Sequence, residues 1–140
     1  MNELKEVCKV LHLAHVAEKF EEIPFENKEQ FIRDVLMLEV DARQTTRIAK
    51  LMKKAKFREL KWLKDYEWND GIHLPATTTK EAICDLHFLK EKQNLLLLGS
   101  PGTGKTHLST ALGLKACERG YEVRFFRVAD LVEQSSLKLP

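Results

Sequence analysis

Apolar side chains recur every three to four positions through the first third of the chain, the spacing of one face of a helix. The spacing predicts a helix over residues 4–20. It predicts two more over residues 28–41 and 45–55, the first of them beginning at Asn27 as the N-cap. Because no glycine occurs before Gly71, the pattern favours a small helical domain over residues 1–67.

The helical pattern breaks at residues 68–78. This segment holds an Asp-Gly turn signal at Asp70–Gly71 and a proline at Pro75. Another helix is then predicted over residues 80–91, where Ile83, Leu86 and Leu89 share one face. Residues 68–93 are therefore predicted to form a linker and a connecting helix.

The periodicity changes after Asn94. The run Leu95–Leu98 is apolar throughout and closed by Gly99, which is typical of a strand buried on both faces of a parallel sheet. The pattern then predicts a helix over residues 104–119, a strand over 122–128 and the start of another helix at 129–134. This order predicts an α/β fold class, with the first part of a doubly wound parallel sheet over residues 94–140.

The glycine-rich segment between the first predicted strand and its helix matches the pattern G-x-x-x-x-G-K-[ST] in full. Its members are Gly99, Ser100, Pro101, Gly102, Thr103, Gly104, Lys105 and Thr106. Gly102 and Gly104 let the backbone turn so that N–H groups point into one anion-binding concavity at the start of a helix. Lys105 reaches the β- and γ-phosphates, and the Thr106 hydroxyl ligates magnesium. The sequence therefore predicts a Walker A loop that binds ATP with Mg²⁺.

The residues needed for hydrolysis form no complete catalytic set in this sequence. A P-loop ATPase needs a second strand that ends in an acidic residue, which holds the magnesium through water. No apolar strand ending in Asp or Glu follows the loop, and Asp130 is expected to cap a helix. The residues present support nucleotide binding, and they leave open whether the chain is an enzyme.

Composition places the chain among globular proteins, at 44% hydrophobic and 31% charged residues. No apolar run approaches the ~20 residues needed to cross a membrane. The acidic N-terminus lacks the features of a signal peptide, so a cytoplasmic location without membrane contact is expected. Cys8, Cys84 and Cys117 form no CxxC pair, which favours reduced thiols over disulfides or a zinc site.

Positive charge is concentrated in residues 42–64, which hold nine basic side chains against Glu59 alone. Residues 1–41 hold ten acidic side chains against five basic ones. A local excess of this size attracts phosphate backbones, although a solvated helix face is the alternative. The candidates for contact with DNA are Arg43, Arg47, Lys50, Lys53, Lys54 and Arg58.

Several segments resemble the IstB-like family of ATP-binding proteins, which are helpers of insertion-sequence transposases and relatives of the DnaC helicase loaders. The segments are residues 54–57, 60–61, 65–68, 94–108, 120–125 and 129–132. The resemblance implies a helical domain followed by an AAA+ ATPase domain, with ATP, DNA and a transposase as partners. It also carries the loop roles over to residues 99–106, one by one.

Members of that family continue with a second acidic motif, sensor residues and an arginine that reaches a neighbouring subunit. None of these follows here, so the chain is expected to be C-terminally truncated, with a homo-oligomer expected only for a completed protein. Three readings stay open: a transposition helper, a DnaC-like helicase loader, and a non-hydrolysing fragment that acts only as a binding module.

Overall fold

The computed structural model describes residues 2–137. Residues 138–140, the end of the predicted partial ATP-binding domain, lie outside that range. The chain divides into two compact units, Met1–Ala49 and Lys50–Pro140.

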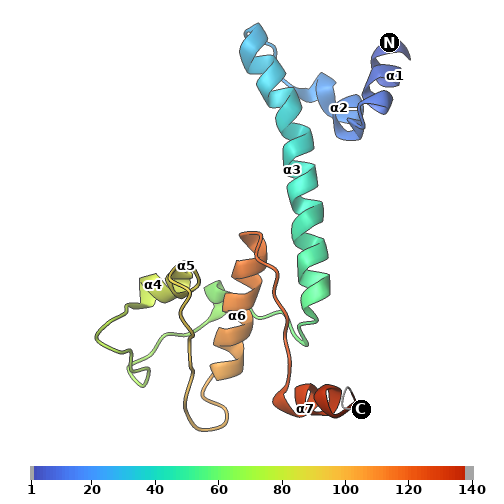
Figure 1. The fold of residues 1–140 in the computed structure, drawn as a ribbon. Helices are drawn as coiled ribbons and strands as arrows, with labels where there is room; N and C mark the ends of the chain where they lie inside the picture. The colour runs from blue at the N-terminus through green and yellow to red at the C-terminus, as the bar shows by residue number, and fades with distance from the viewer. Residues whose placement is uncertain (1, 138–140) are drawn as a thin grey trace. The chain divides into compact units, whose positions relative to one another are not determined.

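The first unit is helical (Figure 1). It contains α1 (Asn2–Val10), α2 (Ala14–Lys19), the 3₁₀ turn η1 (Phe20–Glu22) and the first part of α3 (Lys28–Ala55). The helix predicted over residues 4–20 is interrupted between α1 and α2, where His12 has a φ of +56°. The helices predicted over 28–41 and 45–55 are one helix. The Thr45 and Thr46 hydroxyls donate to the carbonyls of Asp41 and Ala42 one turn earlier, so these polar residues do not end it.

Glu39 of α3 holds α2 in place within this unit. Glu39 as a residue is 5% exposed, and its carboxylate accepts hydrogen bonds from the backbone N–H groups of His15 (2.7 Å) and Val16 (3.3 Å). These are donors of the first turn of α2, which a helix cannot satisfy internally. Burial alone raises the pKa of Glu39, but these hydrogen bonds hold it below its ordinary value. A side chain on α3 thus acts as the N-terminal cap of α2.

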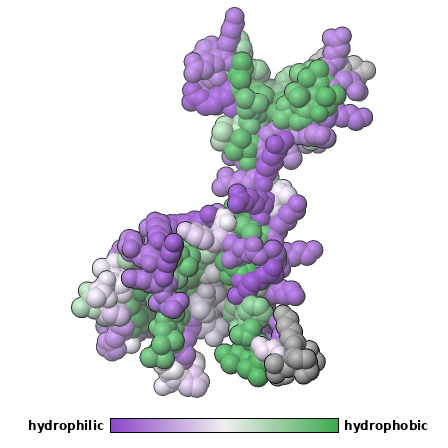
Figure 2. Space-filling model, in the orientation of Figure 1, coloured by the Kyte–Doolittle hydropathy of each residue, from purple (hydrophilic) through white to green (hydrophobic). Residues whose placement is uncertain are grey.

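Few apolar side chains of the first unit are buried. Cys8 and Val16 are, whereas Leu4, Val7 and Leu11 of α1 and its following turn stay exposed. Figure 2 shows apolar side chains gathered over α1 and α2.

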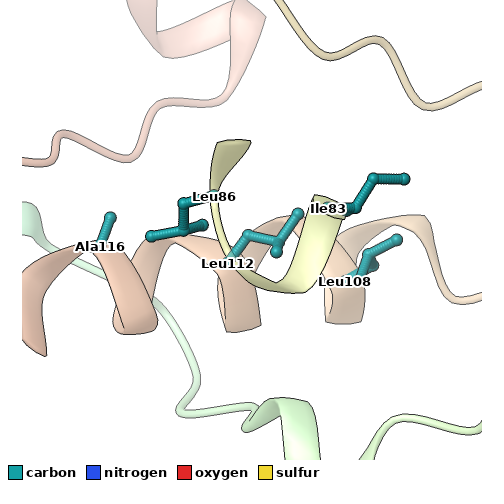
Figure 3. Packing of buried hydrophobic residues seen from close by; sticks show 5 residues of the cluster. All are labelled: Ile83, Leu86, Leu108, Leu112 and Ala116. Carbon is teal, nitrogen blue, oxygen red and sulfur yellow. The ribbon is translucent and has the colours of Figure 1, made fainter. Parts of the chain in front are cut away.

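The second unit is organised around α6 (Lys105–Glu118). Its other elements are the 3₁₀ turn η2 (Leu63–Asp65), α4 (Lys80–Cys84), α5 (His87–Lys90) and α7 (Val128–Leu137). Ile83 and Leu86 pack against Leu108, Leu112 and Ala116 of α6, as Figure 3 shows. All five are at most 5% exposed, and they form the core of this unit.

The helix predicted over residues 80–91 is two short helices. Thr79 caps α4 by accepting from the N–H of Ala82 at 3.1 Å. Leu86 then takes a left-handed conformation, with φ +59°. Its side chain is only 1% exposed, so burial of this leucine in the core accompanies the turn that separates α4 from α5.

The prediction of an α/β fold with a doubly wound parallel sheet is wrong. Residues 2–137 contain no strand. Residues 95–98 and 122–126 do alternate in burial with the period of two typical of extended chain: Leu95 and Leu97 are half-buried, and Leu96 and Leu98 are exposed. A strand, however, exists only by pairing with a neighbour. The segments before and after α6 run along different sides of that helix, as Figure 1 shows, and do not pair with each other.

Candidate functional site

The glycine-rich loop, residues 99–104, leads directly into α6. Gly102 and Gly104 have φ values of +79° and +88°, a left-handed region that glycine enters without strain. Gly104 is the N-cap residue of α6 and has no side chain with which to cap it. The N–H groups at the start of this 14-residue helix therefore face the loop, where a helix favours negative charge.

The Lys105 ammonium group is held inside the loop by backbone carbonyls. Its Nζ donates to the carbonyl oxygens of Gly99 at 2.6 Å and Ser100 at 2.7 Å, and lies 3.5 Å from Thr103 Oγ1. Thr103 Oγ1 also donates to the Ser100 carbonyl at 2.7 Å. One cation and the start of a helix thus converge on the same loop.

Thr106 is exposed in the first turn of α6, next to Lys105. His107 faces another way, because its Nε2 lies 3.1 Å from the Trp62 carbonyl oxygen. Its ring also packs edge-on against Tyr66, with centroids 5.3 Å apart. His107 is therefore occupied by the segment preceding α4 and is not placed to act on a group bound in the loop.

Tyr66 supports the loop at Gly104, and the sequence pattern gave no sign of this role. A Cβ atom at position 104 would lie 3.3 Å from Tyr66 Cε2. The Tyr66 ring also packs edge-on against Trp68 at 5.0 Å, and Lys80 Nζ lies 5.2 Å from the Trp68 ring centroid. Tyr66 and Trp68 precede Gly104 by 38 and 36 positions, so only the fold shows that they lie near the loop.

Asp130 lies in the first turn of α7, where a negative charge complements the helix dipole. Its Oδ2 accepts from Arg58 Nη2 at 3.2 Å. This ion pair directs the carboxylate toward Arg58. Within residues 2–137, no group of three or more His, Cys, Asp or Glu side chains is arranged to hold a metal ion.

The six basic candidates for DNA contact fall into two sets. Three have acidic partners: Arg43 with Glu39 (3.8 Å), Lys54 with Glu122 (2.7 Å) and Arg58 with Asp130 (3.2 Å). For Arg47, Lys50 and Lys53 the described part of the chain offers no carboxylate within salt-bridge distance, and all three are exposed on α3. The ion pairs thus reduce the number of candidate cations that are available to contact an external phosphate.

Two of the three cysteines are buried and the third, Cys84, is half-buried. Burial raises the pKa of Cys117, and the neighbouring Glu118 adds to this. None of the helices within residues 2–137 is both long and apolar enough to cross a bilayer.

Comparison with known proteins identifies the chain's relatives. The family of IstB-like ATP-binding proteins matches residues 6–138. A Geobacillus stearothermophilus protein, named as an ATP-binding protein of insertion sequence IS5376, is 30% identical over 137 residues, covering 94% of this chain and 54% of the relative. A Pseudomonas aeruginosa protein similarly named for insertion sequence IS21 is 30% identical over 140 residues, covering 94% of this chain and 52% of the relative.

A shorter match has higher identity. A Sinorhizobium fredii protein, also named as an insertion-sequence ATP-binding protein, is 47% identical over 47 residues, which is 34% of this chain and 16% of the relative. The chain belongs to the family of IstB-like ATP-binding proteins, which confirms the resemblance seen in the sequence. It spans about half the length of the first two relatives.

Proposed function

We propose that this chain binds ATP with magnesium through residues 99–106, which act as a Walker A loop. The observation that carries the proposal is the position of Lys105 Nζ, 2.6 and 2.7 Å from two carbonyl oxygens of the loop. An ammonium group held this way is poised to exchange neutral acceptors for charged ones. Charge-assisted hydrogen bonds are roughly twice as strong as neutral ones, so phosphate oxygens are the favoured replacement.

The residues present fit a bound triphosphate. Gly102 and Gly104 turn the backbone so that N–H groups face the phosphates, and the start of α6 adds the positive end of its dipole. The exposed Thr106 hydroxyl is the protein oxygen that we assign to Mg²⁺. When bound, the metal neutralises phosphate charge. Within the described chain, hydrolysis has less support than binding, because Asp130 is engaged by Arg58.

A titration with a fluorescent ATP analogue and Mg²⁺ tests this proposal. Lys105→Ala is expected to abolish saturable binding while leaving the far-UV circular dichroism unchanged, because Lys105 bonds only to the loop. Lys115→Ala, a matched change on the same helix, is expected to bind like the parent. Equal affinity of the Lys105 variant and the parent would show that this lysine does not contact the phosphates.

We also propose that the chain serves DNA transposition together with the transposase of an insertion sequence. The names of its relatives support this role, since each is described as an insertion-sequence protein. In this proposal Arg47, Lys50 and Lys53 contribute most of the DNA contact, because Arg43, Lys54 and Arg58 already have acidic partners.

The salt dependence of DNA binding tests the proposal that Arg47, Lys50 and Lys53 contribute most of the DNA contact. Three phosphate contacts give a slope of log K against log salt of about −3, from roughly −0.9 per contact. Reversing Lys50 and Lys53 to Glu is expected to bring the slope to about −1. Reversing Lys5 and Lys9 on α1 changes the net charge equally and should leave the slope near its parental value. If the slope changed equally in both double variants, the effect would come from the overall charge and not from contacts of Lys50 and Lys53 with DNA.

A further inference from the structure

Thr103 lies inside the glycine-rich loop, at a position where the pattern G-x-x-x-x-G-K-[ST] fixes no residue type. Its side chain nevertheless has specific partners in the loop. Thr103 Oγ1 donates to the Ser100 carbonyl oxygen at 2.7 Å. This hydrogen bond closes the stretch from residue 100 to residue 103 on itself, so a side chain that the pattern leaves free helps to define the shape of the loop.

Two donors share the Ser100 carbonyl oxygen. Besides the Thr103 hydroxyl, it accepts from Lys105 Nζ at 2.7 Å, and its two lone pairs allow both bonds at once. Lys105 Nζ also donates to the Gly99 carbonyl at 2.6 Å and lies 3.5 Å from Thr103 Oγ1. Because the Thr103 hydroxyl gives its proton to Ser100, it presents its lone pairs to the ammonium group. Thr103 therefore contacts both the loop carbonyl and the cation that this carbonyl holds.

The same groups close over Gly99. A Cβ atom at position 99 would lie 3.0 Å from Thr103 Oγ1 and 3.9 Å from Lys105 Nζ. The space that a side chain would take at Gly99 is thus occupied in part by the Thr103 hydroxyl. Thr103 is itself exposed, and water is the usual partner of an exposed hydroxyl. Its engagement with the loop is therefore a feature of the loop geometry and not a consequence of burial.

We propose that Thr103 is a positioning residue for phosphate binding, a role that rests on the proposed binding of ATP by this loop. Its hydroxyl keeps the loop closed, with Lys105 beside it, before a ligand arrives. When Lys105 Nζ exchanges the carbonyls for phosphate oxygens, the Ser100 carbonyl loses one of its two donors. The hydrogen bond from Thr103 does not involve Lys105, so it keeps that carbonyl paired. A ligand that meets a preorganised loop loses less free energy to ordering it.

Thr103→Val tests this role, because valine keeps the branched shape of threonine and removes the hydroxyl. Affinity for a fluorescent ATP analogue with Mg²⁺ is expected to fall about fivefold, the effect of one hydrogen bond of average net strength. Affinity for inorganic tripolyphosphate, measured by competition, should fall by the same factor, since the role concerns the phosphates. Thr103→Ser keeps the hydroxyl and is expected to restore most of the affinity for both ligands.

Thr45→Val is the matched control. The Thr45 hydroxyl also donates to a backbone carbonyl, that of Asp41 at 2.9 Å, but it belongs to α3 in the first unit. This variant should bind like the parent, and the circular dichroism of all three variants should equal that of the parent.

The outcomes separate this proposal from the proposed function. If the parent shows no saturable binding, both are overturned. If the parent binds and Lys105→Ala does not, the proposed function stands. The role of Thr103 alone is then overturned if Thr103→Val binds both ligands as tightly as the parent, or if Thr103→Ser binds as weakly as Thr103→Val. An equal loss of affinity in Thr45→Val would overturn it as well.

Discussion

Replacing Gly104 with alanine tests how the loop is supported. Gly104 has a φ of +88°, and an L-residue in the left-handed region costs about 1–2 kcal/mol. A Cβ at this position would also lie 3.3 Å from Tyr66 Cε2, tighter than most contacts of its kind. Gly102, with φ +79°, has nothing within 4 Å of its Cβ position. Gly102→Ala therefore carries the backbone cost alone, and Gly104→Ala carries the same cost plus the contact with Tyr66.

We expect each alanine variant to lose about 1–2 kcal/mol of unfolding free energy, with the larger loss for Gly104→Ala. If the loop relaxes to relieve this strain, it leaves the conformation that we propose binds phosphate, so nucleotide affinity should fall by a corresponding factor of about 5–30. Urea unfolding followed by circular dichroism gives the first quantity, and titration with a fluorescent ATP analogue gives the second.

Tyr66→Leu separates the two contributions, because it removes the ring edge and leaves the backbone of residue 104 unchanged. In that background, Gly104→Ala should cost no more than Gly102→Ala does in the parent. Contact with Tyr66 does not limit position 104 if Gly104→Ala equals the parent in both assays, or if Gly102→Ala is the more damaging of the two.

Two further predictions concern the packing around α6. At Gly113, alanine gains about 1 kcal/mol of helix propensity, but its Cβ would lie 2.9 and 3.0 Å from two ring atoms of Phe57. Overpacking costs typically about 1–3 kcal/mol, so Gly113→Ala should lower the melting temperature in the parent and raise it in a Phe57→Leu background; a rise in both would contradict the contact. Hydrogen bonds from Arg119 and Lys90 lower the pKa of Asp85 from 3.8 to about 2. Its stabilising contribution is therefore full above the unfolded pKa and lost as pH falls from about 4 toward about 2; urea unfolding across this range should depend less on pH in Asp85→Asn, and equal dependence would refute the linkage.

The helix after the glycine-rich loop could be predicted closely from the sequence. The pattern predicts a helix over residues 104–119, and α6 spans Lys105–Glu118. Local signals are strong here, because Gly104 enters the helix and Gly120 leaves it, both with positive φ. The loop geometry follows from the same glycines. The support that Tyr66 gives to Gly104 did not follow, because it depends on residues 38 positions apart.

The predicted strands failed for a different reason. A run such as Leu95–Leu98 reveals that the segment is apolar and extended, and the alternating exposure of its side chains agrees. Whether extended chain becomes a strand depends on a partner in hydrogen-bonding distance, which a local pattern cannot supply. At Leu86, the apolar spacing correctly predicted a core residue but not the end of the helix. The chain takes a left-handed turn there, which stops the helix.

A local count of charges also misses partners that the fold brings in from distant parts of the chain. Counting residues 42–64 gives nine basic side chains against one acidic, a strong field on sequence alone. Two carboxylates from much later in the chain alter that count in space: Glu122 lies 2.7 Å from Lys54, and Asp130 lies 3.2 Å from Arg58. Exposed ion pairs of this kind contribute little to stability, but each removes a cation from the number available to phosphate. The cations of a DNA-binding surface that is inferred from local charge should therefore be counted only after the fold has shown which of them have acidic partners.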